Sequence, residues 1–226
     1  MTTSYNKTTI SLEANIGAGK TTFLTKLREH YSKYFNDICE PLDDWLQVPR
    51  GGDKNILGLL YQDPTRWGYT FQHNAFFTRV DKLTREYDPH RVNITERSVV
   101  SDFKVFAHIL HDEGSINENE WLIYQKWKDF LMRTVPMTTP TFHVYLRLDP
   151  EIAHSRLVKR NRKEESGVPL EYLKKVHSYH EKWMMSSDIP VLELDAALDF
   201  ENDQKIFESY ADRIMARCWE YLPRPE

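Results

Sequence analysis

Apolar and polar positions along the chain alternate between two patterns. Short runs rich in β-branched and aromatic residues predict strands, and longer segments with apolar residues every three or four positions predict helices. In the first helical segment, Phe23, Leu27, Tyr31 and Tyr34 share one face. The strand candidates are TTISL (8–12), DICE (37–40), RVNIT (91–95), FHVYLRL (142–148) and VLEL (191–194). This alternation predicts an α/β fold with a five-stranded parallel sheet flanked by helices.

The chain has 226 residues, which suits one compact domain with a sizeable core. It contains no internal repeat, and its longest turn-rich segment, QVPRGGDKN (47–55), reads as a loop rather than a linker. We therefore expect a single domain over residues 1–226.

Charge and composition narrow the class of function. The formal net charge is −4, so no positive field over the whole protein favours nucleic acid as a partner. No apolar stretch reaches 18 residues, which argues against a membrane span. The two cysteines, Cys39 and Cys218, form no C-x-x-C motif, and the opening MTTSYNKTT lacks the features of a signal or mitochondrial transit peptide. We expect a cytoplasmic enzyme, with a nuclear location left open.

The segment EANIGAGKTT (13–22) follows the first strand candidate and opens a helix, which is the context of a phosphate-binding loop. Lys20 would pair with the β- and γ-phosphates, and Thr21 would ligate Mg²⁺. Ala14 stands where the pattern G-x-x-x-x-G-K-[ST] has its first glycine. An alanine there costs about 1–2 kcal/mol if φ is positive and little otherwise. The predicted donor-binding residues are Asn15, Ile16, Gly17, Ala18, Gly19, Lys20, Thr21 and Thr22.

Charged residues follow the other strand candidates, and the carboxyl ends of parallel strands meet at one edge of a sheet. Glu40 follows the second strand, and Glu96 and Arg97 follow the third. Phosphoryl transfer needs a phosphate cradle, a metal, positive charge and a carboxylate for the acceptor's proton. We assign Glu40 as the base and Thr21 with Glu96 as a Mg²⁺ site. A basic run follows the fourth strand: Arg156, Lys159, Arg160, Arg162 and Lys163. Arg97 and the arginines of this run could neutralise the transferred group.

Taken singly, each feature also has a purely structural interpretation. Glu40-Pro41 could form a turn, Glu96-Arg97 a structural ion pair, and the basic run a solvated helix face. The pairs His108/His111 and His177/His180 have helical spacing but lack the partners of a zinc site, and we expect them on solvated helix surfaces.

Over nearly its whole length the sequence resembles the deoxyribonucleoside kinases. The matching blocks are EANIGAGKTTF, EPLDDW, YQDPTRWGYTFQ, ERSVVSD, INENEWLIYQKW, RLVKRNRKEESGVPLEYL and LDAALDF. The resemblance implies a P-loop kinase with an Arg-rich lid at about 156–168, ATP or another NTP as donor, and Mg²⁺. It also implies a homodimer formed through helices near 99–112 and 117–132.

The resemblance also implies residue roles. Glu40 accepts the proton of the 5′-hydroxyl, with Arg97 beside it, and Tyr61 and Glu165 bind the 3′-hydroxyl. The residues implied around the base are Trp45, Gln72, Arg79, Asp102 and Phe106. Those implied around the donor are Arg156, Arg160 and Arg162 in the lid and Asp199 and Phe200 near the donor's base.

The predicted activity is 5′-phosphorylation of deoxynucleosides for nucleotide salvage. Asp102 with Arg79 suits a base that presents an amino group, so deoxycytidine or a purine deoxynucleoside is favoured over thymidine. Alternatives are a thymidine-accepting multisubstrate kinase, a nucleoside monophosphate kinase and a nucleotide-dependent switch. Val100, Phe103 and Lys104 depart from the family pattern and could alter the wall of the nucleoside pocket.

Overall fold

The computed structural model describes residues 8–48, 54–162, 165 and 167–221. The predicted five-stranded, all-parallel sheet is confirmed, with strand order β2-β3-β1-β4-β5. The strands are β1 (Thr9–Ala14), β2 (Phe35–Ile38), β3 (Val92–Glu96), β4 (His143–Arg147) and β5 (Val191–Asp195). β1 is therefore the central strand, and its carboxyl end leads into the phosphate loop.

Helices connect and cover the strands. They are α1 (Lys20–Tyr31), α2 (Leu42–Leu46), α3 (Ile56–Gln62), α4 (Pro64–Glu86), α5 (Val99–Ser101), the π-helix η1 (Asp102–Ala107), α6 (His108–Asp112), α7 (Glu118–Thr134), the 3-10 helix η2 (Pro136–Thr138), α8 (Pro150–Arg160), α9 (Leu170–Met185) and α10 (Gln204–Cys218). Local signals explain several boundaries: Asp63 caps α4 with Pro64 in its first turn, and Asn117 with Glu120 forms a capping box at α7.

The prediction that Tyr34 shares the face of the first helix is wrong, because α1 ends at Tyr31. Tyr34 lies in the short turn before β2, which begins at Phe35, and still packs against the core from there. Because β2 begins at Phe35, too few residues remain after Tyr31 for a further helical turn.

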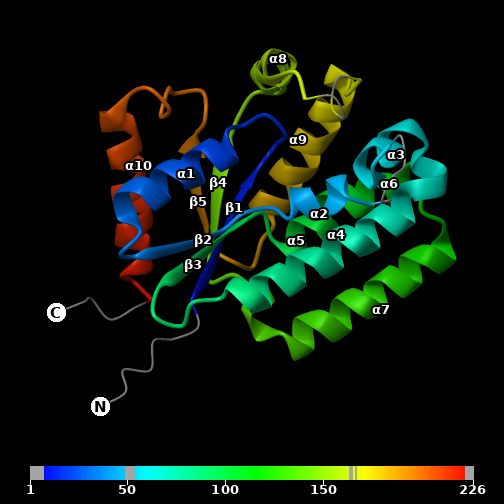
Figure 1. Ribbon diagram of the computed structural model, residues 1–226, viewed down its shortest axis with the longest axis horizontal. Helices are drawn as coiled ribbons and strands as arrows, with labels where there is room; N and C mark the ends of the chain where they lie inside the picture. The colour runs from blue at the N-terminus through cyan, green and yellow to red at the C-terminus, as the bar shows by residue number, and fades with distance from the viewer. Residues whose placement is uncertain (1–7, 49–53, 163–164, 166, 222–226) are drawn as a thin grey trace.

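Figure 1 shows helices on both sides of the sheet, and an apolar layer lies on each face. On one face, Ile10 and Leu12 of β1 pack with Phe23 of α1 and Phe207 of α10. On the other face, Tyr145 of β4 packs with residues of η1, α6 and α9. Side chains alternate between the faces along each strand, so both faces of the central strand are buried.

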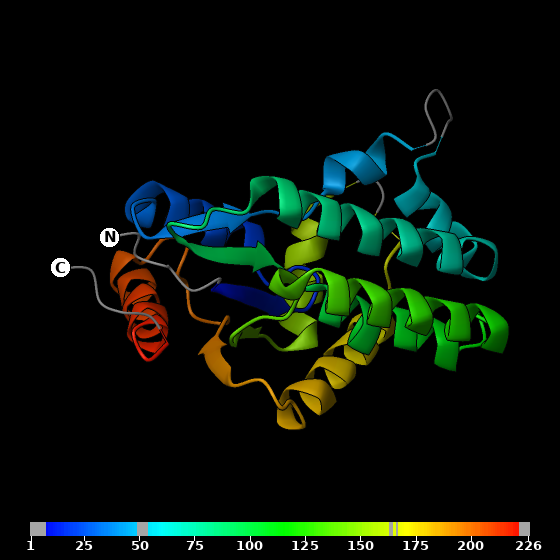
Figure 2. The same ribbon diagram turned by 90° about the horizontal axis from the view of Figure 1, so that it is seen from below.

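A third apolar cluster lies beyond the edge of the sheet, between α2, α3, α4 and α7. Phe76 of α4 and Tyr124 of α7 meet edge to face, with ring centroids 5.9 Å apart. Figures 1 and 2 show α4 and α7 lying side by side. Within the described ranges, no helix combines the length and apolar character that a membrane crossing requires.

The expectation of solvated histidine pairs is wrong for His180, which is fully buried. The face of α9 that carries it packs on β4, where Tyr145 stacks parallel to the imidazole at 6.0 Å. His108 and His111 are half-buried against Trp121, at 5.0 and 4.6 Å between ring centroids. In the part of the chain that the structure describes, no three His, Cys, Asp or Glu side chains form a metal-binding group.

Candidate active site

The loop between β1 and α1 has the backbone of a phosphate cradle. Gly17 and Gly19 have φ of 82° and 89°, in the left-handed region that favours glycine. A Cβ on Gly17 would lie 2.5 Å from the carbonyl oxygen of Ala153, and one on Gly19 would lie 2.9 Å from the ring of Phe200. Both positions therefore require glycine for space as well as for conformation.

Ala14, the departure from the loop pattern, is the last residue of β1 and is fully buried. Among the described residues, those other than glycine with positive φ are Arg97 and Asn161. Position 14 therefore does not need the left-handed conformation, and the alanine carries little conformational cost.

Lys20, the first residue of α1, is buried beneath the loop and donates to the carbonyl oxygen of Asn15 over 3.3 Å. Burial, and secondly the positive charge of Arg97, lower the pKa of Lys20 to about 7. Asn15 also ties the loop to the fold, because its amide donates to the carbonyl of Leu173 in α9 over 2.9 Å. The lysine thus sits where an anion would restore its charge.

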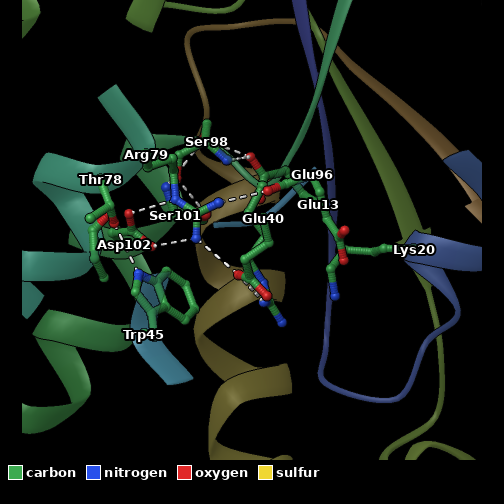
Figure 3. A network of polar contacts seen from close by, with 12 residues as sticks. Glu13, Lys20, Glu40, Trp45, Thr78, Arg79, Glu96, Ser98, Ser101 and Asp102 are labelled. Carbon is green, nitrogen blue, oxygen red and sulfur yellow. Dashed lines mark hydrogen bonds and ion pairs between the residues drawn. The ribbon is translucent and has the colours of Figure 1, made fainter. Parts of the chain in front are cut away.

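Glu40, just beyond β2, contacts two buried arginines, Arg79 from α4 and Arg97 after β3, and Figure 3 shows it beside Arg79. Its Oε1 accepts hydrogen bonds from Nη2 of Arg79 and from Nη1 of Arg97, each at 2.9 Å. Burial opposes ionisation of Glu40, but Arg97 and then Arg79 outweigh it and hold its pKa at about 2. The carboxylate is therefore charged at neutral pH.

Arg79, which projects from α4, also joins Glu40 to Asp102. Its Nε donates to Oδ2 of Asp102 over 2.9 Å, and its Nη1 donates to the carbonyl oxygen of Glu96 over 2.7 Å. Burial raises the pKa of Asp102, although Arg79 opposes that shift. One guanidinium thus links the predicted base to the carboxylate predicted to select the nucleobase.

A single cavity runs from the phosphate loop to Asp102. Sequence-predicted residues that line it are Ile16, Gly17, Gly19, Lys20, Thr21, Thr22, Glu40, Trp45, Tyr61, Gln72, Arg79, Glu96, Arg97, Asp102, Phe106, Arg160, Arg162 and Glu165. Predicted residues outside its lining are Asn15, Ala18, Arg156, Asp199 and Phe200. Lining residues that the sequence interpretation missed are Cys39, Leu42, Leu57, Leu60, Phe71, Ala75 and Tyr172. Ala75 could have been found, because it shares a helical face with Gln72 and Arg79.

The end of the cavity near Asp102 suits a flat heterocycle. Trp45 meets Phe71 edge to face at 5.3 Å, and Phe106 lies under the guanidinium of Arg97 at 4.9 Å. The Gln72 side chain makes no hydrogen bond with the residues that the structure describes, and its Oε1 is buried. An aromatic slot with a free amide and a carboxylate can stack a base and read its polar edge.

The lid residues divide into two groups. Arg162 pairs with Glu165 at 3.1 Å, and Arg160 pairs with the other oxygen of the same carboxylate. Arg156 instead donates to the carbonyl oxygen of Ala196 over 2.9 Å. Lys163 of the basic run, together with residues 164 and 166 of the predicted lid, lies outside the described residues.

The two side chains predicted to hold a metal, Thr21 and Glu96, meet beside the loop. The Thr21 hydroxyl donates to Oε1 of Glu96 over 2.8 Å. Hard oxygen ligands suit Mg²⁺, which commonly takes one or two protein ligands and completes its shell with phosphates and water. The pair therefore fits the predicted metal.

Val100, Phe103 and Lys104, which depart from the family pattern, do not line the cavity. Phe103 stacks on Trp121 at 5.1 Å and faces α7, while Val100 packs in the layer under β4. None of the three forms the wall itself, because the helical turns after Ser98 direct them away from it, but the cluster that contains Val100 packs against Phe106, which lines the cavity.

Comparison with known proteins agrees with the geometry. The family model described as deoxynucleoside kinase matches residues 10–219. Deoxycytidine kinase 2 of Gallus gallus is 39% identical, with 91% of this chain and 88% of the relative covered. A probable deoxycytidine kinase of Fowlpox virus is 38% identical (91% and 86% covered), and human mitochondrial thymidine kinase 2 is 36% identical (92% and 78% covered). With a family match over most of its length and relatives that it nearly spans, the chain belongs to the deoxynucleoside kinase family, and it is a kinase whose acceptor is a deoxynucleoside.

Proposed function

We propose that the protein transfers the γ-phosphoryl group of ATP, or of another NTP, to the 5′-hydroxyl of a deoxynucleoside for nucleotide salvage. Deoxycytidine or a purine deoxynucleoside is the favoured acceptor over thymidine. The observation that carries this proposal is the arrangement of one cavity lined by the phosphate loop, Glu40 and Asp102, in which Glu40 lies between Lys20 of the loop and Asp102 (Figure 3). That order matches a donor triphosphate, a reacting hydroxyl and a nucleobase laid end to end.

At the donor end, the backbone amides at the start of α1 and the charge of Lys20 would hold the β- and γ-phosphates. Thr21 and Glu96 would hold Mg²⁺, whose chemistry is to neutralise charge on the phosphate oxygens. Arg160 and Arg162 lie at the same cavity and would add positive charge where the phosphoryl group is transferred.

At the acceptor, Glu40 would orient the 5′-hydroxyl and take its proton. Both arginines bind Oε1 of Glu40, so Oε2 is the oxygen left to face the hydroxyl. The low pKa keeps the carboxylate ionised but makes it a weak base, so its proton transfer belongs late in the reaction. A loose transition state for phosphoryl transfer is compatible with such a base, since the nucleophile needs little activation.

At the base, Asp102 provides the discrimination. A carboxylate only accepts hydrogen bonds, so it rewards an exocyclic amino group and penalises the carbonyl that thymine presents. A mismatched buried polar group costs about 1–3 kcal/mol, or roughly tenfold to a hundredfold in kcat/KM. Gln72 can pair with any base, because its amide both donates and accepts.

The test is kcat/KM for the four deoxynucleosides measured in competition, with deoxynucleoside monophosphates as a separate acceptor set. We expect thymidine to rank last and the monophosphates to be inert. Preference for thymidine would reject the assignment of Asp102 and favour the multisubstrate alternative. Turnover of monophosphates alone would point to a nucleoside monophosphate kinase.

We also propose a homodimer, supported by an unpaired apolar face on α7. Leu122, Ile123, Trp127 and Phe130 are 54, 45, 52 and 45% exposed, and Ile123, Trp127 and Phe130 fall on one helical stripe. A second copy of α7 packed there would bury this stripe. Trp127→Glu should yield a monomer in sedimentation velocity where the wild type sediments as a dimer; an unchanged dimer would place the interface elsewhere.

The compartment that we propose is the cytoplasm, since Cys39 and Cys218 are free thiols, as suits a reducing environment. Microscopy of a fluorescent fusion tests this placement.

A further inference from the structure

Glu13 is a fully buried carboxylate on the central strand, and the mechanism proposed above does not use it. Ile10, Leu12 and Ala14 of β1 join the apolar layer on one face of the sheet, whereas Ser11 and Glu13 point to the other face. The interior strands of a parallel sheet are usually apolar on both faces, and a buried carboxylate is costly unless it is well paired. Glu13 does not line the cavity, so its place calls for another reason.

The partner of Glu13 is Ser98, 85 residues away in sequence. Oε1 of Glu13 accepts a hydrogen bond from the Ser98 backbone N–H over 3.0 Å and one from its hydroxyl over 2.6 Å. His143 lies 3.9 Å from the same oxygen, but its Nδ1 is 2.7 Å from the hydroxyl of Ser11. Because burial lowers the pKa of His143, it contributes little positive charge. The two bonds to Ser98 are therefore the main contacts of this carboxylate.

Ser98 in turn organises the start of the next helix (Figure 3). It is the N-cap of α5, and its hydroxyl oxygen accepts from the backbone N–H of Ser101 over 3.2 Å. Its carbonyl oxygen accepts from the Ser101 hydroxyl over 2.7 Å and from the backbone N–H of Asp102 over 3.4 Å. The placement of Asp102 thus depends on Ser98.

The residue before Ser98 is Arg97, which has a φ of 61°. A residue with a side chain in this region costs about 1–2 kcal/mol and persists only where its surroundings hold it. The backbone N–H of Arg97 donates to the carbonyl oxygen of Leu12 over 3.0 Å, and its Nη2 donates to that of Ala14 over 3.4 Å. Three consecutive residues of β1 therefore accept hydrogen bonds from Arg97 and Ser98. Leu12 and Ala14 do so through their backbone carbonyls, and Glu13 does so through its side chain.

We infer that Glu13 and Ser98 form a latch that holds Arg97 in its strained conformation and so keeps its guanidinium on Glu40. Glu13 is a positioning residue: it acts through Ser98 and Arg97 and touches neither substrate. The latch rests on the role proposed for Arg97 beside Glu40. Its loss lets the turn relax toward ordinary backbone angles and draws the guanidinium away from the carboxylate.

The test compares Glu13→Leu, which cannot accept a hydrogen bond, with Glu13→Gln, whose amide oxygen can still accept both bonds from Ser98. Misplacing a catalytic group by about 1 Å costs up to about a hundredfold in rate. We expect kcat to fall about tenfold to a hundredfold in Glu13→Leu and to stay within about threefold of wild type in Glu13→Gln. The KM for the donor should change little, because the phosphate loop is untouched.

Asn93→Ala is the matched control for stability. Asn93 is also fully buried and lies near the amino end of β3, where it bonds Asn36 and the backbone of Asp88. It should lower the melting temperature as Glu13→Leu does but leave kcat unchanged. If kcat falls in proportion to the melting temperature in all variants, Glu13 is merely structural and the latch is rejected.

The pH profile provides a readout that general instability does not move. The charged groups facing Glu40 are Lys20 from α1, Arg79 from α4, Arg97 and Asp102, and Arg97 is the cation that adjoins Ser98 in the chain. If the Arg97 guanidinium retreats, the acid limb of kcat/KM moves to higher pH in Glu13→Leu and stays in place in Asn93→Ala. An unmoved acid limb in a folded Glu13→Leu overturns the inference.

Two further variants keep the test decisive. Ser98→Ala removes the hydroxyl but retains Glu13, so it decides the question if Glu13→Leu does not fold. Arg97→Ala separates the latch from the mechanism on which it rests: wild-type turnover in Arg97→Ala rejects the proposed role of Arg97 itself. If kcat falls in Arg97→Ala but a folded Ser98→Ala keeps the wild-type kcat, the role of Arg97 stands and only the latch is rejected.

Discussion

Replacing Glu40 by Gln separates the charge of the proposed base from its shape. The glutamine amide oxygen can still accept from Arg79 and Arg97, so the side chain should keep its place. The charge is lost, however, and the two arginines are affected unequally. Arg79 keeps its ion pair with Asp102, whereas Arg97 loses the carboxylate it pairs with, and both arginine side chains are only 7% exposed.

The magnitudes follow from that geometry. Removing one partner of a buried ion pair costs about 3–5 kcal/mol, and the retained hydrogen bonds should recover part of it. Loss of a positioned base lowers kcat by about 10²–10⁴. Arg97 and Arg79 hold the pKa of Glu40 at about 2, below its ordinary value of 4.5, so this group stabilises the fold fully above pH 4.5. That stabilisation is lost as the pH falls from 4.5 through about 2, and Glu40→Gln should lack this pH dependence.

The assay is ADP release under saturating donor and nucleoside, with nucleoside affinity measured separately by calorimetry. We expect kcat to fall steeply while the nucleoside Kd stays within a few-fold. Glu181→Gln is the control, because Glu181 also accepts from an arginine, Arg147, but lies outside the cavity. Turnover of Glu40→Gln within about threefold of wild type would refute the assignment of Glu40 as base.

Three further predictions test the rest of the site. Gly17→Ala should abolish donor binding and destabilise the fold by at least about 1–2 kcal/mol, whereas Ala14→Gly should leave donor KM unchanged; donor titrations with thermal melts check both. A bound triphosphate should raise the pKa of Lys20 from about 7, so above pH 7 donor binding takes up a proton and weakens as pH rises. Calorimetry in two buffers of different ionisation enthalpy should show this proton uptake. Lys20→Ala should lose both the proton uptake and the activity. Asp102→Ala with Arg79→Met should raise the rank of thymidine among the four deoxynucleosides, but total turnover should fall because Arg79 also binds Glu40; an unchanged ranking contradicts the assignment of Asp102.

Much of the local architecture follows from neighbours in the sequence. The β-branched runs predicted all five strands to within a few residues, because the pattern of apolar residues that marks a strand lies within a few adjacent positions. The phosphate loop was predictable for the same reason: Gly17 and Gly19 allow conformations that other residues resist, and Lys20 and Thr21 follow in fixed order. Parallel strands then bring their carboxyl ends to one edge, which is enough to gather Glu40, Glu96 and the loop around one site.

The sequence by itself thus determined the α/β fold, the loop and the charged residues that line the cavity, but it missed most of the apolar lining. Only the tertiary structure decided how those side chains pair. Arg79 joins Glu40, 39 positions before it, to Asp102, 23 positions after it, and Glu13 grips Ser98 across 85 positions. It also decided that His180 is buried and that Arg97 has positive φ. The physical reason is that hydrogen bonds and burial depend on distances in space. The periodicity of one segment does not indicate which residues of a distant segment will pack against it.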